Sequence, residues 1–160
     1  MNYKTDTYGA ICLELSTKSK SSLGFGAILV SKRGAILGMG WNRKATKEDR
    51  DMMKYVDYAI HSEQAAILDG LLRHRNIEGS QIYVLGQVMQ GVNKGLLTIK
   101  EEKVFICTKC PHAFLQYNIS VNIPHKDGWL NMTPEEATET GKKFYGQGYW
   151  DKFTFNHDTI

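Results

Sequence analysis

The chain has 160 residues, of which 42% are hydrophobic and 23% charged, and its formal net charge is +3. This composition suits one folded domain with a real core and excludes a disordered chain. The small positive charge permits an anionic ligand but does not demand nucleic acid. The N-terminus is polar and no apolar run is long enough to cross a bilayer, so we expect a cytoplasmic protein with one domain over residues 1–160.

The first half of the chain predicts a helix, a hairpin and a second helix. Residues 6–19 carry apolar side chains at helical spacing, and the apolar runs 25–31 and 35–41 flank a Lys-Arg-Gly turn, as in a hairpin. The charged segment that follows shows no clear strand, and we expect helix there only near Met52–Tyr58. A further helix is predicted over His61–His74, with an apolar stripe formed by Ala65, Leu68 and Leu72.

The second half predicts strands around one helix, followed by a tail. The strands are expected at Gln81–Met89, Leu96–Ile99, Val104–Ile106 and Ile119–Ile123, with a helix over Cys107–Tyr117. Pro124 is expected to halt the last strand because it cannot donate to a sheet ladder. The aromatic tail, about 129–160, begins a helix at Thr133, with proline and two acids in its first turn. We expect the tail to dock on the core; a pocket wall or a subunit interface is the alternative.

Cysteine usage narrows the chemistry. Three cysteines, an odd number, argue against a disulfide scaffold. The pair Cys107 and Cys110 is then metal-binding, redox-active or structural. Thiolates at positions i and i+3 of a helix share one face, and the positive end of the helix favours the thiolate form. Cys12, on the first helix, is expected to be a core residue.

A second motif, His61-Ser62-Glu63, opens the preceding helix. One imidazole and two thiolates leave a fourth position for water, the pattern of a catalytic zinc. A carboxylate beside that water can take its proton and pass it on. Because positions i and i+2 lie about 200° apart on a helix, His61 and Glu63 can serve one centre only if it lies off the helix end. A redox pair would leave this motif unexplained; a structural zinc is the other alternative.

Together the two motifs resemble the signature of the cytidine and deoxycytidylate deaminase superfamily, H-x-E followed by P-C-x-x-C, which includes the tRNA adenosine deaminases. Upstream, Gly26–Val30 and Gly38–Asn42 look like the first hairpin of that family, so the resemblance covers roughly residues 8–123. It implies an α/β fold of three layers, α-β-α and cytidine deaminase-like, with a mixed central sheet and helices on both faces. It also implies hydrolytic deamination of a nucleobase with release of ammonia.

The resemblance assigns roles to individual residues. Zinc (Zn2+) would be held by His61, Cys107 and Cys110, and Glu63 would carry protons from water to the ring nitrogen and to the leaving ammonia. The substrate contacts that the resemblance implies are Asn42 at the base or sugar, Phe25 and Ala27 lining the pocket, and the backbone around Ser62 and Ile106 at the base edge.

The sequence departs from this signature in three places. Ile106 stands where the family usually has proline, with Pro111 after the cysteine pair instead. Ser62 stands where alanine is commonest, so a small residue is kept. The stretch 89–103 looks like an insertion that adds to the rim of the pocket.

The expected substrate is cytosine in a free nucleoside or nucleotide, as in cytidine and dCMP deaminases. Residues 54–67 resemble the deoxycytidylate branch, whereas residues 40–43 resemble the tRNA branch, so a base within RNA or single-stranded DNA and a free purine stay as alternatives. A non-catalytic zinc-binding module is an alternative of another class. Glu63 argues against it, because a structural site needs no proton carrier. Members of the family are usually oligomeric, which implies a homo-oligomer, a dimer or larger.

Overall fold

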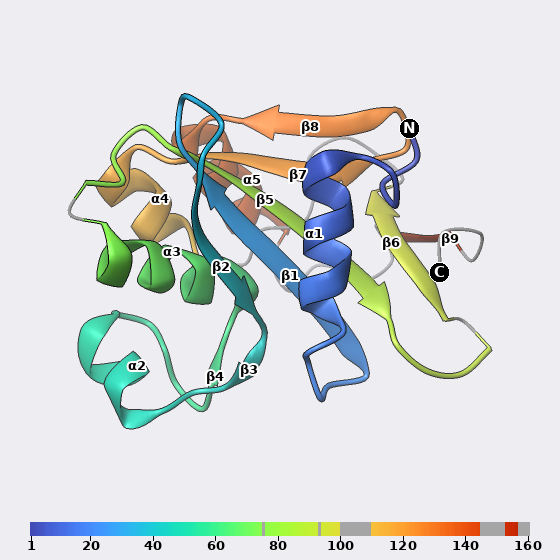
Figure 1. The fold of residues 1–160 in the computed structure, drawn as a ribbon, viewed down its shortest axis with the longest axis horizontal. Coiled ribbons are helices and arrows are strands. Elements are labelled where there is room, and N and C mark those ends of the chain that lie inside the picture. The colour runs from blue at the N-terminus through green and yellow to red at the C-terminus, as the bar shows by residue number, and fades with distance from the viewer. Residues whose placement is uncertain (75, 93, 100–109, 145–152, 157–160) are drawn as a thin grey trace.

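The computed structural model describes residues 1–74, 76–92, 94–99, 110–144 and 153–156. Within these residues one mixed sheet of seven strands runs in the order β2-β1-β5-β6-β7-β8, with β9 paired to β6 and β7 also paired to β5 (Figure 1). The strands of this sheet are β1 (Leu23–Val30), β2 (Ile36–Trp41), β5 (Gln81–Val88), β6 (Gly95–Ile99), β7 (Ser120–His125), β8 (Gly128–Met132) and β9 (Phe153–Asn156). The helices are α1 (Thr7–Ser16), α2 (Lys47–Met52), α3 (Ser62–Arg73), α4 (Pro111–Tyr117) and α5 (Pro134–Phe144).

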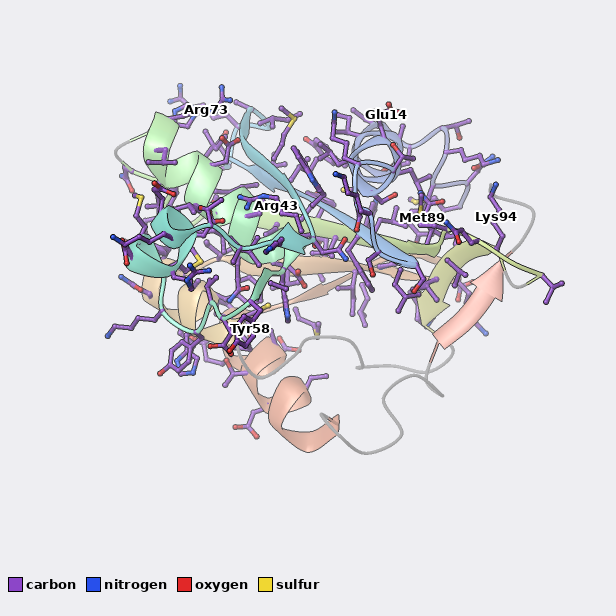
Figure 2. All side chains as sticks on the ribbon, turned by 90° about the horizontal axis from the view of Figure 1, so that it is seen from below. Glu14, Arg43, Tyr58, Arg73, Met89 and Lys94 are labelled. Carbon is purple, nitrogen blue, oxygen red and sulfur yellow. The ribbon has the colours of Figure 1, made fainter. Side chains whose placement is uncertain are left out.

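Both faces of the sheet are covered, because side chains alternate along its central strands. Ile28 of β1 and Leu85 of β5 pack with Cys12 and Leu15 of α1, whereas Leu29, one residue further along β1, packs in a second cluster with α3, α4 and α5. Figure 2 views the sheet edge-on, with α1 on one side and α5 on the other. The predicted mixed sheet between helices is confirmed, and the near-continuous apolar runs reflect strands buried on both faces.

Two glycines of β2 let α3 approach this strand closely. A Cβ at Gly38 would lie 2.2 Å from the carbonyl oxygen of Ala66, and one at Gly40 would lie 2.4 Å from its backbone nitrogen. Any side chain at either position would therefore push the helix away. The first turn of α3, which carries the H-x-E motif, is thereby seated directly against the sheet.

Between β2 and α3 the chain makes an excursion over residues 43–60, drawn below α3 in Figure 1. A short antiparallel ladder between β3 (Arg43–Lys44) and β4 (Ala59–Ile60) closes it. Three apolar residues of the excursion form a small core with two residues of α3. They are Ala45, Val56 and Ile60 of the excursion and Ala65 and Leu68 of the helix. The ladder ends at Ile60, directly before the H-x-E motif, and so fixes the position from which α3 begins.

The expectation of helix near Met52–Tyr58 is wrong, because the helix of the excursion lies earlier, at α2. Thr46 and Asp49 form a capping box that sets its start: the Thr46 hydroxyl accepts from the Asp49 N–H, and the Asp49 carboxylate accepts from the Thr46 N–H. Arg43 also donates to Asp49, at 2.6 Å. This guanidinium holds the pKa of Asp49 below its usual value.

The C-terminal half brings further corrections. Pro124 does not halt its strand, since β7 continues to His125 and pairs there with β6. The proline lies between Asn122, which pairs with β5, and His125, which pairs with β6, and it stands opposite Trp129 of β8. The hairpin of β7 with β8 and the strand β9 have no counterpart in the prediction. Val104–Ile106 lies outside the described residues.

The helices predicted at α5 and α3 are confirmed, although one apolar residue assigned to α3 is exposed. Thr133 caps α5 as expected, its hydroxyl accepting from the Glu136 N–H at 3.1 Å. The predicted docking of the tail helix is confirmed at Ala137, which is fully buried in the core. In α3, Leu72 is 64% exposed, so it does not belong to the predicted stripe. None of the described helices is long and apolar enough to cross a membrane.

Candidate metal centre and active site

Three side chains of the predicted site converge where α3 and α4 begin. One ligand atom from each of His61, Glu63 and Cys110 lies within 4.8 Å of those of the other two. Glu63 and Cys110 are buried and His61 is half-buried. Among the described residues this is the one group of three such side chains that could hold a metal ion. The predicted ligand Cys107 and the predicted contact Ile106 lie outside the described residues.

His61 can reach the same point as Glu63 because it stands just outside the helix. It is the N-cap of α3, and its backbone is extended, with φ −75° and ψ 157°. Its side chain therefore escapes the 100° per residue rotation that would separate positions i and i+2. The side chain of Gln64 accepts from the His61 N–H at 2.9 Å and fixes the residue at the helix start. The centre lies off the helix end, as the spacing requires.

Cys110 comes to the site from the start of α4. It is the N-cap residue of this helix, and Pro111 follows at the first helical position, where a missing N–H costs nothing. The predicted helix over 107–117 thus begins at Pro111 within the described part of the chain. Phe114, one turn further on, is fully buried in the core and anchors α4. Cys110 itself is 1% exposed.

The donor set of this cluster fits zinc. The Nδ1 atom of His61 lies 3.3 Å from the Sγ atom of Cys110. Bond lengths of about 2.05 Å to nitrogen and 2.3 Å to sulfur at a tetrahedral angle give a separation of about 3.6 Å between two ligands of one zinc ion. A hydrogen bond from imidazole to sulfur has a similar length, so this distance alone does not identify a zinc site. The stronger support for zinc is the chemistry of the ligands, an imidazole nitrogen and a cysteine sulfur.

Glu63 is held in the buried part of this cluster. The Ser62 hydroxyl donates to its Oε2 atom at 2.9 Å, and Ser62 itself is fully buried. A carboxylate in this position can accept a proton and release it without leaving the site. The sequence analysis predicts for Ser62 only a small side chain and a backbone contact with the base. The spacing of the motif does not predict that the Ser62 hydroxyl points toward Glu63.

A neighbouring aromatic pair was also missed by sequence reasoning. The ring of Tyr55 stacks on His112 of α4, with centroids 4.0 Å apart and planes inclined by 16°. Tyr55 has a left-handed backbone (φ 67°), and its carbonyl accepts from the side chain of Gln64 at 3.4 Å. The excursion is thus tied both to the start of α3 and to α4. His112 does not belong to the metal-binding group of His61, Glu63 and Cys110.

Three of the predicted substrate contacts, Asn42, Phe25 and Ala27, lie in or beside β1 and contact other parts of the sheet. The Asn42 side chain accepts from the Phe25 N–H at 2.8 Å and donates to the Leu23 carbonyl at 2.9 Å, so it pins the start of β1. The ring of Phe25 lies over Gly86 of β5, where an added Cβ would meet it at 2.4 Å. Ala27 is fully buried in the core. Contacts of these residues with a substrate stay predictions.

Cys12, the cysteine outside the motif, behaves as the sequence predicts. It is fully buried between α1 and the sheet, and its thiol donates to the Tyr83 carbonyl at 3.4 Å. Burial raises the pKa of this thiol, which keeps it protonated and unreactive. It plays no part in the cluster at His61.

Two solved structures resemble this chain in their fold. The crystal structure of apo dCMP deaminase from the cyanophage S-TIM5 aligns with a TM-score of 0.50 and 18% sequence identity, covering 84% of this chain and 89% of that one. The same enzyme in complex with dCMP and dUMP aligns with a TM-score of 0.48 and 19% identity, over 81% of this chain and 86% of that one. At 18% identity, the likeness to the apo enzyme shows the fold alone. No curated protein sequence matches the chain.

The family comparison is more specific. The model of the cytidine and deoxycytidylate deaminase zinc-binding region matches residues 3–123. This range holds both motifs, the whole of the cluster at His61, and the sheet from β1 to the middle of β7. The chain therefore belongs to the cytidine and deoxycytidylate deaminase family.

Proposed function

We propose that this protein is a zinc-dependent hydrolase that removes the amino group from cytosine in a free nucleoside or nucleotide. The observation that carries the proposal is the convergence of His61, Glu63 and Cys110 at the starts of α3 and α4. The family to which the chain belongs is described by its zinc-binding region and by cytidine and deoxycytidylate, which supports both the metal and the pyrimidine.

Each residue of the cluster has a separate task in this proposal. His61 and Cys110 hold the metal together with Cys107, the third ligand that the resemblance implies. When bound, zinc supplies a Lewis acid that makes water a nucleophile at neutral pH. Glu63 would take one proton from the attacking water and deliver it to the ring nitrogen of the base. It would then carry the second proton, from the hydroxyl added to the ring carbon, to the amino group, which leaves as ammonia as the carbon–nitrogen bond breaks. The buried position of Glu63 keeps bulk water from competing for these protons.

A purely structural zinc site would not need this carboxylate. Burying a charged side chain is unfavourable unless it is paired and hydrogen-bonded, and Glu63 is 8% exposed. The burial of Glu63 beside the ligand atoms of His61 and Cys110 supports a catalytic role for this carboxylate. We therefore favour an enzyme over a binding module.

Other properties remain predictions of the same proposal. The partner is a small nucleoside or nucleotide, and the net charge of +3 creates no need for a polynucleotide. Residues 1–160 are expected to act as one deaminase domain in the cytoplasm, as a homo-oligomer. Asn42, Phe25 and Ala27, with the backbone at Ser62 and Ile106, are the substrate contacts to examine first.

The test is ammonia release by the purified, zinc-loaded protein from a panel of compounds. The panel contains cytosine, cytidine, deoxycytidine and their monophosphates, adenine and guanine compounds, and single-stranded oligonucleotides. Release from one of the small pyrimidines supports the proposal and names the substrate. Release only from oligonucleotides or purines would contradict the pyrimidine assignment, and silence across the panel with zinc bound would contradict the enzyme itself.

A further inference from the structure

The hydroxyl of Ser62 has a partner within the cluster, the carboxylate of Glu63. Here the Ser62 Oγ atom lies 2.9 Å from Oε2 of Glu63, with Ser62 0% and Glu63 8% exposed. A hydrogen bond to a carboxylate in such a poorly solvated place is stronger than one at the surface.

This hydrogen bond acts on the softest torsion of the glutamate. The last side-chain torsion of Glu, which turns the carboxylate plane, has a broad and nearly two-fold energy profile. The torsion itself therefore sets the carboxylate plane only weakly, and hydrogen-bond donors around the carboxylate decide its orientation. A donor on one oxygen selects one orientation of the plane and hence the direction in which each oxygen presents its lone pairs.

The donor itself stands on a rigid part of the fold. Ser62 is the first residue of α3, and the close approach of this helix to β2 reaches its backbone: a Cβ added at Gly40 would lie 2.7 Å from the Ser62 carbonyl oxygen. Gln64 fixes the same turn through the His61 N–H. The backbone that carries the Ser62 hydroxyl is therefore fixed by the fold, as is expected of a group that supports a proton carrier.

We propose that Ser62 is a positioning residue, whose hydroxyl orients the Glu63 carboxylate for proton transfer. The inference rests on the proposed function, since the group being oriented is the proton carrier of that reaction. It adds to the backbone contact with the base edge that the family resemblance implies for the same residue. Misplacement of a reacting group by about 1 Å can lower a rate by about a hundredfold, so the loss of one orienting bond is expected to be measurable.

The test compares Ser62→Ala with a matched control, Ser80→Ala. Ser80 is 2% exposed, and its hydroxyl donates to the Ile77 carbonyl at 2.6 Å, away from the cluster. Both variants lose one buried, hydrogen-bonded hydroxyl, so a general loss of stability affects them alike. We expect kcat of Ser62→Ala to fall by about tenfold or more with KM and zinc content unchanged. The Ser80→Ala variant should keep its kcat. Equal kcat values for the two variants would overturn the inference.

A second readout does not depend on turnover. Crystal structures of the zinc-loaded wild-type protein and of Ser62→Ala, both without substrate, report the orientation of the Glu63 carboxylate. The inference predicts a rotated or doubly placed carboxylate in the variant, whereas one unchanged orientation would overturn it. If the wild-type protein deaminates nothing, the proposed function fails, and the crystallographic comparison still decides whether Ser62 orients Glu63.

Discussion

Replacing Gly40 by alanine tests whether close packing of α3 on β2 seats the site. A Cβ at this position would lie 2.4 Å from the Ala66 nitrogen, 2.6 Å from the Ala65 Cβ atom and 2.7 Å from the Ser62 carbonyl oxygen. Two of these three atoms are backbone, so no side-chain rotation relieves the contacts. Gly40 also has an ordinary negative φ, so the effect is steric and not conformational.

The size of the effect follows from overpacking. Inserting a methyl group into a well-packed interior costs about 1–3 kcal/mol, and the upper part of this range applies where backbone must move. For a chain of this length each kcal/mol lowers the melting temperature by about 2–4 °C. We therefore expect a fall of about 4–12 °C, together with weaker catalysis, because the helix that moves carries His61 and Glu63.

A matched control lies on the facing helix. Gly70 of α3 points toward the sheet, but a Cβ there would meet the end of the Leu29 side chain at 2.8 Å, with no backbone atom closer than 3.7 Å. Alanine also favours the helix by about 1 kcal/mol over glycine. Thermal unfolding should thus show Gly70→Ala close to the wild-type protein. If Gly40→Ala is as stable as Gly70→Ala, the close approach does not seat the helix and the argument is refuted.

Two further predictions concern the elements that frame the site. Asp49→Asn should destabilise the protein by about 1–3 kcal/mol near pH 7, because it removes a carboxylate that binds Arg43 and caps α2. Since folding lowers the pKa of Asp49, this stabilisation is present above the ordinary value of about 3.9 and is lost as the pH falls through the lowered pKa. Urea unfolding at pH 7 and pH 3 should therefore show a gap between Asp49→Asn and wild type that narrows in acid. The exposed Asp51→Asn change in the same helix serves as control, and a gap that widens in acid would contradict the assignment. Thr133→Ala should cost about 0.5–2 kcal/mol by uncapping α5, while Thr133→Ser keeps the hydroxyl and most of the stability. Equal losses in the two Thr133 variants would show that the cap contributes nothing.

The placement of His61 and Glu63 at a helix start could be predicted from the sequence because it depends on a short spacing. An H-x-E motif at a predicted helix start forces the two side chains to meet off the helix end, and the extended backbone of His61 shows how they do so. The capping signal at Thr133 and the hairpin of β1 with β2 were equally local. In each of these cases the residues that decide the structure are close neighbours in the chain.

Features that depend on distant partners could not be predicted in the same way. The strand β9 pairs with β6, which lies about 57 residues earlier in the chain, and Pro124 lies where β7 changes its neighbour from β5 to β6. The side chain of Asn42 offers no sign that it pins the start of β1, and that of Ser62 no sign that it turns to Glu63. These are choices of side-chain direction and strand order, which tertiary packing decides.

In the proposed reaction, Glu63 moves protons at a zinc centre held in part by His61 and Cys110. The most direct measurement is ammonia release by the wild-type protein and by Glu63→Gln, both loaded with zinc and with the bound metal quantified in each. The account predicts equal zinc content and loss of at least a hundredfold in turnover for the variant, because the amide keeps the shape of the carboxylate but cannot carry the proton. Turnover by Glu63→Gln comparable to that of the wild-type protein at equal zinc content would contradict it.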